Sequence, residues 1–221
     1  MKIEIPILYT DRYLMVANKP AGIVVEEDTR GNQSVIGNIK ATLPNGLRGN
    51  NILQPIHRID RAVSGVLLIA CKQSVLKLLN LALAERKITK TYLALVDTKP
   101  PKDSDTLKHW FAKDNTAMKA IVKDQKFQLS AEAILEYQIR EKLQGKYLLE
   151  INLLTGKYHQ IRAQLAHIGC PVIGDLKYGS KTPLKDQTIA LHAWRIGFKH
   201  PIDEDYKVVE AEMPNGWGTN F

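Results

Sequence analysis

The residues best suited to chemistry lie in one short charged stretch, residues 57–65, which reads His-Arg-Ile-Asp-Arg-Ala-Val-Ser-Gly. In it Asp60 lies between Arg58 and Arg61, and such positive surroundings favour the ionised form of a carboxyl group. An ionised carboxylate can act as a nucleophile or as a base at neutral pH. The spacing alone fits a catalytic carboxylate and a buried ion pair at a strand entry equally well.

Other catalytic arrangements fit the sequence less well. Histidines could join Asp60 in a metal site, but His159 and His167, two helical turns apart, are the nearest approach to a ligand pair. No metal is therefore expected. A metal-dependent hydrolase using His57 and Asp60 is a rival interpretation, and it predicts that a chelator abolishes activity. A serine hydrolase is rejected because Ser64 lacks the Gly-x-Ser-x-Gly elbow.

The strands around the charged stretch should position it. Residues 66–70 form an apolar run that is typical of a buried strand. Two shorter strands are predicted at 5–9 and 13–18, and the second should stop at a turn formed by Lys19-Pro20-Ala21-Gly22. Lys19 is either a solvated turn residue or a cation at a cleft.

The rest of the chain alternates between predicted helices and strands. Ser34 should cap a helix that runs to about Leu43, and Ser74 should cap a second helix. We expect the apolar stripe of that second helix to contain Val75, Leu78, Leu79, Ala82 and Leu83. A third helix should start near Tyr158, bury Ile161, Leu165 and Ile168, and stop at Gly169. Strands are predicted at 89–96, 131–139, 146–154, 189–198 and 206–213, with only short strands between 107 and 122.

Composition narrows the class of protein. The 221 residues carry a formal net charge of +8 and a pI near 9.4, which favours a polyanionic partner if the basic residues share one face. The two cysteines, Cys71 and Cys170, are too far apart for a Cys-x-x-Cys pair. Because the sequence shows neither a signal peptide nor a long apolar run, a cytoplasmic location without membrane attachment is expected.

Several blocks, which occur in the family's order along the chain, resemble the RluA-type family of RNA pseudouridine synthases. One is the charged stretch with its strand, and the others are residues 18–22, 90–94 and 155–162 and the late blocks 171–179 and 191–193. The predicted helices and strands indicate an α+β fold with a long, mostly antiparallel mixed sheet flanked by a few helices, and the resemblance implies the same fold. A single domain over residues 1–221, without a separate N-terminal RNA-binding module, is expected.

The resemblance also implies an activity, the isomerisation of uridine to pseudouridine in RNA. Asp60 would attack C1′ or remove a ribose proton, Tyr92 would lie against the uracil, and Arg162 would pair with Asp60. The target base must leave its stack, and Arg58 would fill the space. Since the reaction is redox-neutral, no cofactor is expected. Further contacts to RNA are expected from Lys19, Arg61, Lys157, His159 and Gln160.

Some features depart from the family pattern. Val63 stands where Thr is common, and Lys157 replaces an Arg, which keeps the charge but loses the bidentate geometry. Segment 107–122 resembles the family poorly. Because no separate N-terminal RNA-binding module is expected, the chain, predicted to be a monomer, should recognise tRNA or rRNA through its own basic surface. That surface would include Lys113, Lys119, Lys123 and Lys126. The alternative is a non-catalytic RNA-binding protein of the same fold, which predicts binding without product.

Overall fold

A computed structural model describes residues 3–27, 31, 33–42, 52–215 and 217. They fall into two compact units, which are described one at a time. The first unit contains the residues up to Thr89 together with Ala193–Glu212. The second unit contains Lys90–His192 and the residues after Glu212. The expected single domain over residues 1–221 stays a prediction.

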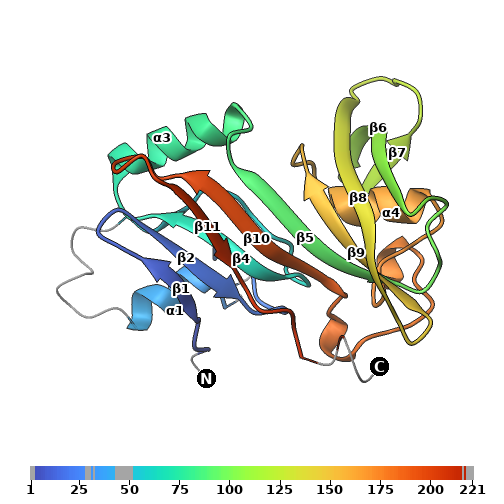
Figure 1. Ribbon diagram of the computed structural model, residues 1–221, viewed down its shortest axis with the longest axis horizontal. Coiled ribbons are helices and arrows are strands. Elements are labelled where there is room, and N and C mark those ends of the chain that lie inside the picture. The colour runs from blue at the N-terminus through green and yellow to red at the C-terminus, as the bar shows by residue number, and fades with distance from the viewer. Residues whose placement is uncertain (1–2, 28–30, 32, 43–51, 216, 218–221) are drawn as a thin grey trace. The chain divides into compact units, whose positions relative to one another are not determined.

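The first unit is a sheet with helices beside it (Figure 1). Its strand order is β1-β2-β4-β10, with β3 paired to β4 and β11 paired to β10, and its described registers are antiparallel. Its elements are β1 (Ile7–Thr10), β2 (Leu14–Lys19), α1 (Val35–Thr42), β3 (Gln54–Pro55), β4 (Ser64–Ala70), α3 (Gln73–Ala84), β10 (Leu191–Lys199) and β11 (Tyr206–Glu210).

Strands β2 and β4 form the centre of this unit. Leu67, Leu68 and Ile69 are fully buried, so the strand predicted at 66–70 is confirmed. The register places Lys19, the last residue of β2, opposite Gly65, the second residue of β4. Gly65 has φ +116°, and a Cβ there would collide with the carbonyl of Ala193. Only glycine therefore fits where the charged stretch enters β4.

The two predicted helices of this unit form, with changes at their ends. Ser34 Oγ accepts the Gly37 N–H at 2.9 Å, which confirms the first cap, while Leu43 lies outside the described residues. Helix α3 begins at Gln73, one residue before the expected cap Ser74, and its N-cap makes no side-chain hydrogen bond. The stripe prediction was wrong for Leu78, which is 46% exposed because Val75 and Leu79 define the buried side of the helix.

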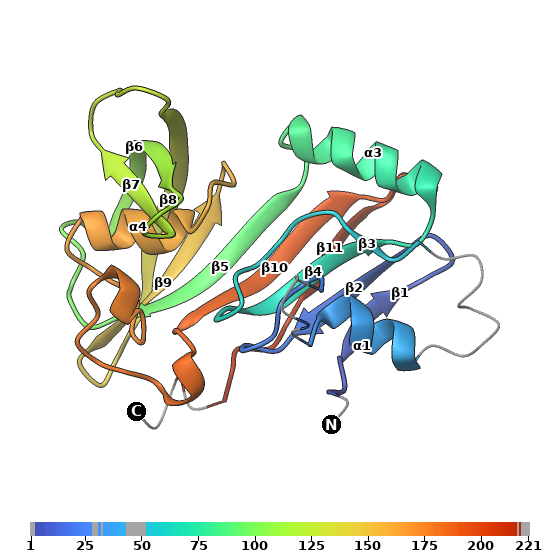
Figure 2. The same cartoon turned by 180° about the vertical axis from the view of Figure 1, so that it is seen from behind.

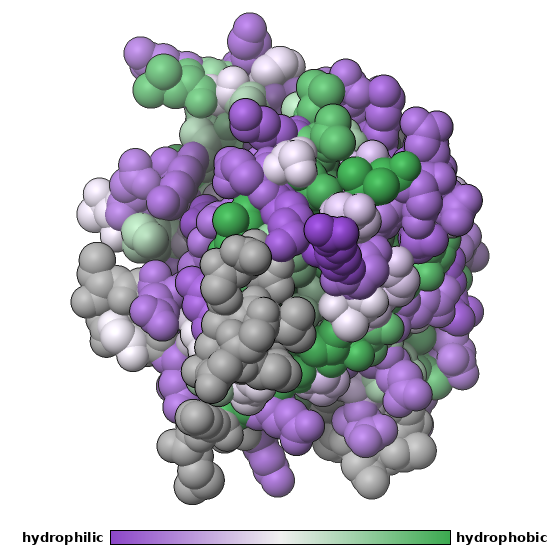
Figure 3. All heavy atoms as spheres, turned by 90° about the vertical axis from the view of Figure 1, so that its left-hand side faces the viewer, coloured by the Kyte–Doolittle hydropathy of each residue, from purple (hydrophilic) through white to green (hydrophobic). Residues whose placement is uncertain are grey.

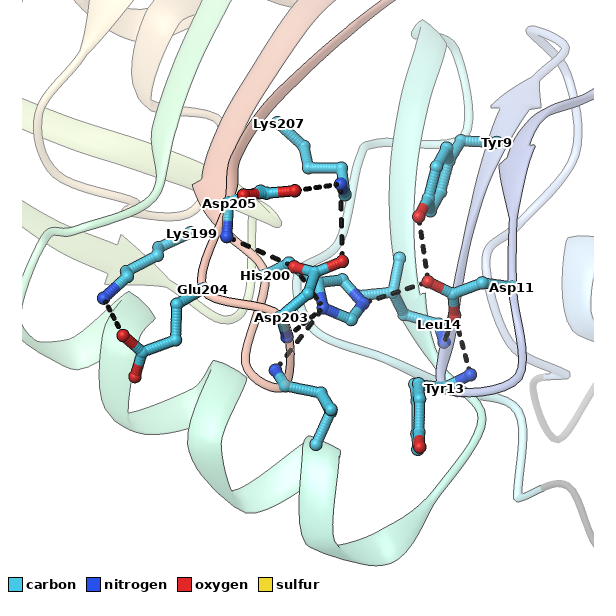
Figure 4. Close-up of polar contacts among 11 residues, drawn as sticks. Tyr9, Asp11, Tyr13, Leu14, Lys199, His200, Asp203, Glu204, Asp205 and Lys207 are labelled. Carbon is cyan, nitrogen blue, oxygen red and sulfur yellow. Dashed lines mark hydrogen bonds and ion pairs between the residues drawn. The ribbon is translucent and has the colours of Figure 1, made fainter.

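A buried histidine joins two turns of the first unit (Figure 4). The His200 side chain, 1% exposed, has Nε2 3.0 Å from Asp11 in the β1–β2 turn and Nδ1 2.9 Å from Asp203 in the β10–β11 turn. Asp11 also accepts the backbone N–H groups of Tyr13 and Leu14 and the hydroxyl of Tyr9. One imidazole and its two carboxylates thus fasten the first hairpin to the last.

The second unit is an antiparallel sheet with the order β5-β9-β8-β6-β7. Figure 2 shows α4 lying against this sheet. A small core forms where Ala163 of that helix meets Phe111 and Ala133. The elements are β5 (Thr89–Val96), β6 (Ser104–Asp114), β7 (Lys119–Lys123), β8 (Ala131–Leu143), β9 (Lys146–Leu153), α4 (Gln160–His167) and the 3-10 turns η1 (Leu176–Tyr178) and η2 (Lys185–Gln187).

Two predictions for this unit are corrected. The short strands expected in 107–122 are the long hairpin β6–β7, whose buried residues Leu107, His109 and Phe111 alternate along β6. A histidine in the buried row and lysines on the other face hid this period of two. The third helix starts at Gln160, not Tyr158, because His159 has a left-handed backbone with φ +54°.

The fold class predicted from the sequence is confirmed, since antiparallel pairing dominates and α1, α3 and α4 accompany the strands. Figure 3 shows one side of the first unit, where apolar side chains are interspersed among hydrophilic ones. In the described part of the chain, every helix is too short or too polar to cross a bilayer.

Candidate active site

The loop that carries Asp60 runs from β3 to β4. Ile59 and Val63 are 7% and 1% exposed, so apolar side chains anchor the loop on both sides of Asp60. Asp60 is half-buried, and its backbone carbonyl accepts the Val63 N–H at 3.0 Å. Its carboxylate is therefore held by a packed loop without being enclosed in hydrocarbon.

The basic neighbours of Asp60 lie on the surface. Arg58 and Arg61 are both exposed, as a contact with RNA requires. Arg61 Nε donates to the carbonyl of Gly22 at 2.8 Å, and the Gly22 N–H donates to the carbonyl of Arg61 at 2.7 Å. Gly22 has φ +93°, which favours glycine. These two bonds hold the turn after β2 against the Asp60 loop.

Lys19 lies beneath this contact and is fully buried. Its ammonium donates to the carbonyls of Pro20, Ile23 and Arg61 at 2.9, 2.8 and 3.2 Å, which matches its three N–H groups. Burial lowers the pKa of Lys19 to about 7, while the charge of Asp60 acts to raise it. A residue so enclosed has no surface for RNA, so we now assign Lys19 to holding the Asp60 loop.

Tyr92 and Arg162 belong to the second unit. Tyr92 is buried on β5, opposite Ile151 of β9. Arg162, on α4, is 7% exposed and forms a bidentate pair with Asp175, with Nε to Oδ2 at 2.6 Å and Nη2 to Oδ1 at 2.9 Å. The guanidinium carbon lies 5.1 Å from the centroid of the Tyr178 ring.

Sequence reasoning missed Asp175 and Tyr178 as partners of Arg162. Both residues belong to a block that resembles the family, but nothing in their spacing pointed to α4. Asp175 is 1% exposed, and it balances the buried charge of Arg162. The expected pairing of Arg162 with Asp60 stays a prediction.

The residues around the start of α4 differ in how far their side chains are exposed. Lys157 is exposed, as an RNA contact requires. Gln160 is 3% exposed, and its amide accepts from Thr155 and Lys157 and donates to Ile134 and Gln164. We therefore assign Gln160 to holding the start of α4 and not to RNA. His159 is half-buried and stacks on Tyr158.

Comparison with known proteins adds an independent observation to this geometry. The profile of a family described as RNA pseudouridylate synthase matches residues 13–167, which is more than half of the chain. The chain belongs to this family. The resemblance identified in the sequence is confirmed, and with it the class of RNA-modifying isomerases.

Individual members of the family are similar over nearly the whole chain. Ribosomal large subunit pseudouridine synthase C of Buchnera aphidicola subsp. Baizongia pistaciae is 36% identical over 216 residues, which cover 94% of this chain and 66% of that protein. The tRNA pseudouridine synthase C of Pasteurella multocida is 31% identical over 237 residues, with 97% and 94% covered. A structure named human RNA Pseudouridylate Synthase Domain Containing 4 has a TM-score of 0.76 at 22% identity and covers 95% of this chain and 89% of its own.

One further cluster of ionisable side chains in this family member has donors that suit a metal ion. His109 of β6, Asp124 after β7 and His167 of α4 have ligand atoms within 4.8 Å of one another. His167 Nε2 lies 2.9 Å and His109 Nε2 lies 3.7 Å from Asp124 Oδ1. Two imidazoles and a carboxylate are typical zinc ligands.

Hydrogen bonding around His109 argues against a metal there. The amide nitrogen of Gln164 faces the carbonyls of Leu107 and Ala133, and its oxygen accepts from Gln160, so the orientation of the amide is fixed. This nitrogen lies 3.0 Å from His109 Nδ1, which must then accept. The proton of a neutral His109 is on Nε2, which blocks that atom as a ligand. We interpret the cluster as a set of polar contacts that holds the β6–β7 hairpin against α4.

Proposed function

We propose that the chain converts specific uridines of structured tRNA or rRNA to pseudouridine, with Asp60 as the catalytic carboxylate. The observation that carries this proposal is the half-buried Asp60 on a loop fixed from below by the buried Lys19. Such a loop can hold a carboxylate in one position against a flipped nucleoside, which lowers the entropy cost of the reaction. The matched relatives act, by their names, on ribosomal RNA or tRNA.

The other proposed roles follow the resemblance. Asp60 attacks C1′ or removes a ribose proton, and the detached uracil turns and rejoins through C5. Tyr92 contacts the uracil, and Arg162, fixed by Asp175, orients the Asp60 carboxylate. Arg58 replaces the extruded base in its stack. Arg61, Lys157 and His159 contact the RNA. The reaction as proposed consumes no cofactor and takes place in the cytoplasm on a monomer.

The test uses RNA tritiated at C5 of uridine, because rearrangement to pseudouridine must release that tritium to water. The protein should release tritium without added metal. Asp60→Asn should abolish release while RNA affinity stays within about tenfold, or roughly 1.4 kcal/mol. Tritium release by the Asn variant would show that Asp60 is not the catalytic group. Release by neither protein, with RNA still bound, would support the non-catalytic alternative.

A further inference from the structure

The β6–β7 hairpin carries two lysines that lie over aromatic rings of other segments. Lys113 Nζ, near the end of β6, is 4.9 Å from the centroid of the Tyr158 ring, and Lys119 Nζ, at the start of β7, is 5.9 Å from that of Tyr178. Both lysines are exposed. The face of an aromatic ring attracts an ammonium within about 6 Å only weakly at an exposed site. The two ammonium groups therefore lie over the rings but can leave them for another partner.

The two rings belong to a set of three, Tyr158, His159 and Tyr178, which we call the aromatic trio. Tyr158 and His159 are stacked, with centroids 3.8 Å apart and planes at 22°. His159 meets Tyr178 edge to face at 5.7 Å, and its Nδ1 lies 3.0 Å from the Tyr178 hydroxyl oxygen. Burial raises the pKa of Tyr178, so this hydroxyl keeps its proton and can donate it to His159.

Two further hydrogen bonds tie the trio to the hairpin. The Ala120 N–H donates to the Tyr178 hydroxyl oxygen at 2.8 Å, and the Tyr158 hydroxyl donates to the carbonyl of Met118 at 3.3 Å. The backbone of the hairpin that carries Lys113 and Lys119 is therefore fixed relative to the rings before any ligand arrives. Preorganisation of this kind lowers the entropy cost of binding.

The trio adjoins Arg162, since Tyr178 contacts His159 on one side and the guanidinium of Arg162 on another. We propose that the aromatic trio, with Lys113 and Lys119, binds an unpaired nucleotide that neighbours the target uridine. This inference rests on the proposed function, because it takes Arg162 to mark the catalytic site. The neighbouring base stacks on Tyr158 and displaces the ammonium of Lys113, which then pairs with a phosphate together with Lys119.

The chemistry of the trio selects unpaired RNA over a duplex. Every base has a π-face that can stack on an aromatic side chain, but the bases of a duplex are already stacked on one another. Lysines alone would attract either form of RNA through its phosphates. Unpaired RNA should therefore respond to loss of the Tyr158 ring, whereas duplex RNA should not.

The chain offers a matched control for the two lysines. Lys123 lies over Phe127 at 5.1 Å and Lys126 over Trp110 at 5.5 Å, so each is also a lysine over a ring, but neither ring is in the trio. Replacing either pair of lysines by methionine removes the same charge. A difference between the two double variants then reports position and not net charge.

The test measures binding of a fluorescein-labelled oligouridylate of about 12 nucleotides, by anisotropy, in the Asp60→Asn background. Tyr158→Leu should weaken binding about 5- to 100-fold, whereas Tyr158→Phe, which keeps the ring, should stay within about threefold. The slope of log affinity against log salt should fall by about 1.4 in Lys113→Met/Lys119→Met, at about 0.7 for each lost phosphate contact, and by less in Lys123→Met/Lys126→Met.

Equal effects of the two double variants would overturn the inference, as would unchanged binding by Tyr158→Leu. It would also fail if a duplex of the same length lost as much affinity as the single strand. These binding measurements need no turnover, so they stand apart from the test of activity. Tritium release by the wild type with unaltered binding by the trio variants would defeat this inference alone.

Discussion

Lys19→Met should change how the stability of this protein depends on pH. The substitution keeps an unbranched side chain, one atom shorter, and removes an ammonium that is fully buried beneath the Asp60 loop. Burial lowers the pKa of Lys19 from 10.5 to about 7. Between these two values the unfolded chain binds a proton that the folded chain does not, so the free energy of unfolding rises with pH. The Met variant lacks this contribution.

The size of the effect follows from the pKa. One proton of difference gives a slope of about 1.4 kcal/mol per pH unit, reduced near the lower pKa, where the folded protein is half protonated. From about pH 7 to about pH 9, the wild type should therefore gain about 2 kcal/mol of stability relative to Lys19→Met. The three carbonyl acceptors favour the ammonium form and work against this gain.

Urea unfolding of both proteins at several pH values measures the difference. Lys87→Met is the control for net charge, because Lys87 belongs to the same unit and its side chain is 70% exposed. A stability difference between wild type and Lys19→Met that stays constant over this range would refute the reasoning. It would mean that the three carbonyls fully offset the cost of burying the charge.

Three further predictions follow from buried or clustered charges. Asp175→Asn should cost about 3–5 kcal/mol in urea unfolding, because it leaves the buried guanidinium of Arg162 without its carboxylate, and a loss below about 1 kcal/mol would contradict the pairing. Burial would raise the pKa of Asp11, but hydrogen bonds from Leu14, Tyr13 and Tyr9 and the charge of His200 lower this pKa overall. The contribution of the Asp11 carboxylate to the free energy of unfolding is therefore present above about pH 4 and is lost on acidification. The stability gap between wild type and Asp11→Asn should accordingly narrow in acid, and a gap that widened there would show the opposite shift. Added zinc should leave the thermal midpoint of unfolding unchanged. A metal site would stabilise the protein by about 2.7 kcal/mol at a zinc concentration of 100 times its Kd. Such a stabilisation, if it were lost in His167→Ala, would overturn the tautomer assigned to His109.

The sequence predicted those elements whose pattern is local. The apolar run at 66–70 and the strands predicted at 131–139 and 146–154 are visible in neighbouring residues. The last two form the hairpin β8–β9, in which both turn residues, Gln144 and Gly145, have positive φ. The sequence predicted only short strands where the long strand β6 lies, because the buried face of β6 includes His109, whose amide partner lies 55 residues away. No local pattern could reveal that contact.

The same distinction applies to the candidate site. Asp60 stands out because its charged neighbours are adjacent in sequence. The sequence allowed Lys19 to be a solvated turn residue or a cation at a cleft. It did not reveal the burial of this residue, because two of its carbonyl partners, Pro20 and Ile23, lie in the turn segment that follows it, and the third is 42 residues away. The bond between Arg162 and Asp175 spans 13 residues and a change of direction of the chain. Charge on a side chain is visible in a sequence, but burial of that charge is not.

The division of the chain into units has a consequence for its synthesis. The strands contributed by residues 193–212 complete the sheet that contains β1, β2 and β4, so the chain must leave the ribosome as far as these residues before that sheet is complete. Residues 90–192 emerge in one piece and can pair their strands earlier. Strands β1, β2 and β4, which are made before β10, thus wait with apolar surface uncovered, and they are the segment for which a chaperone would matter most.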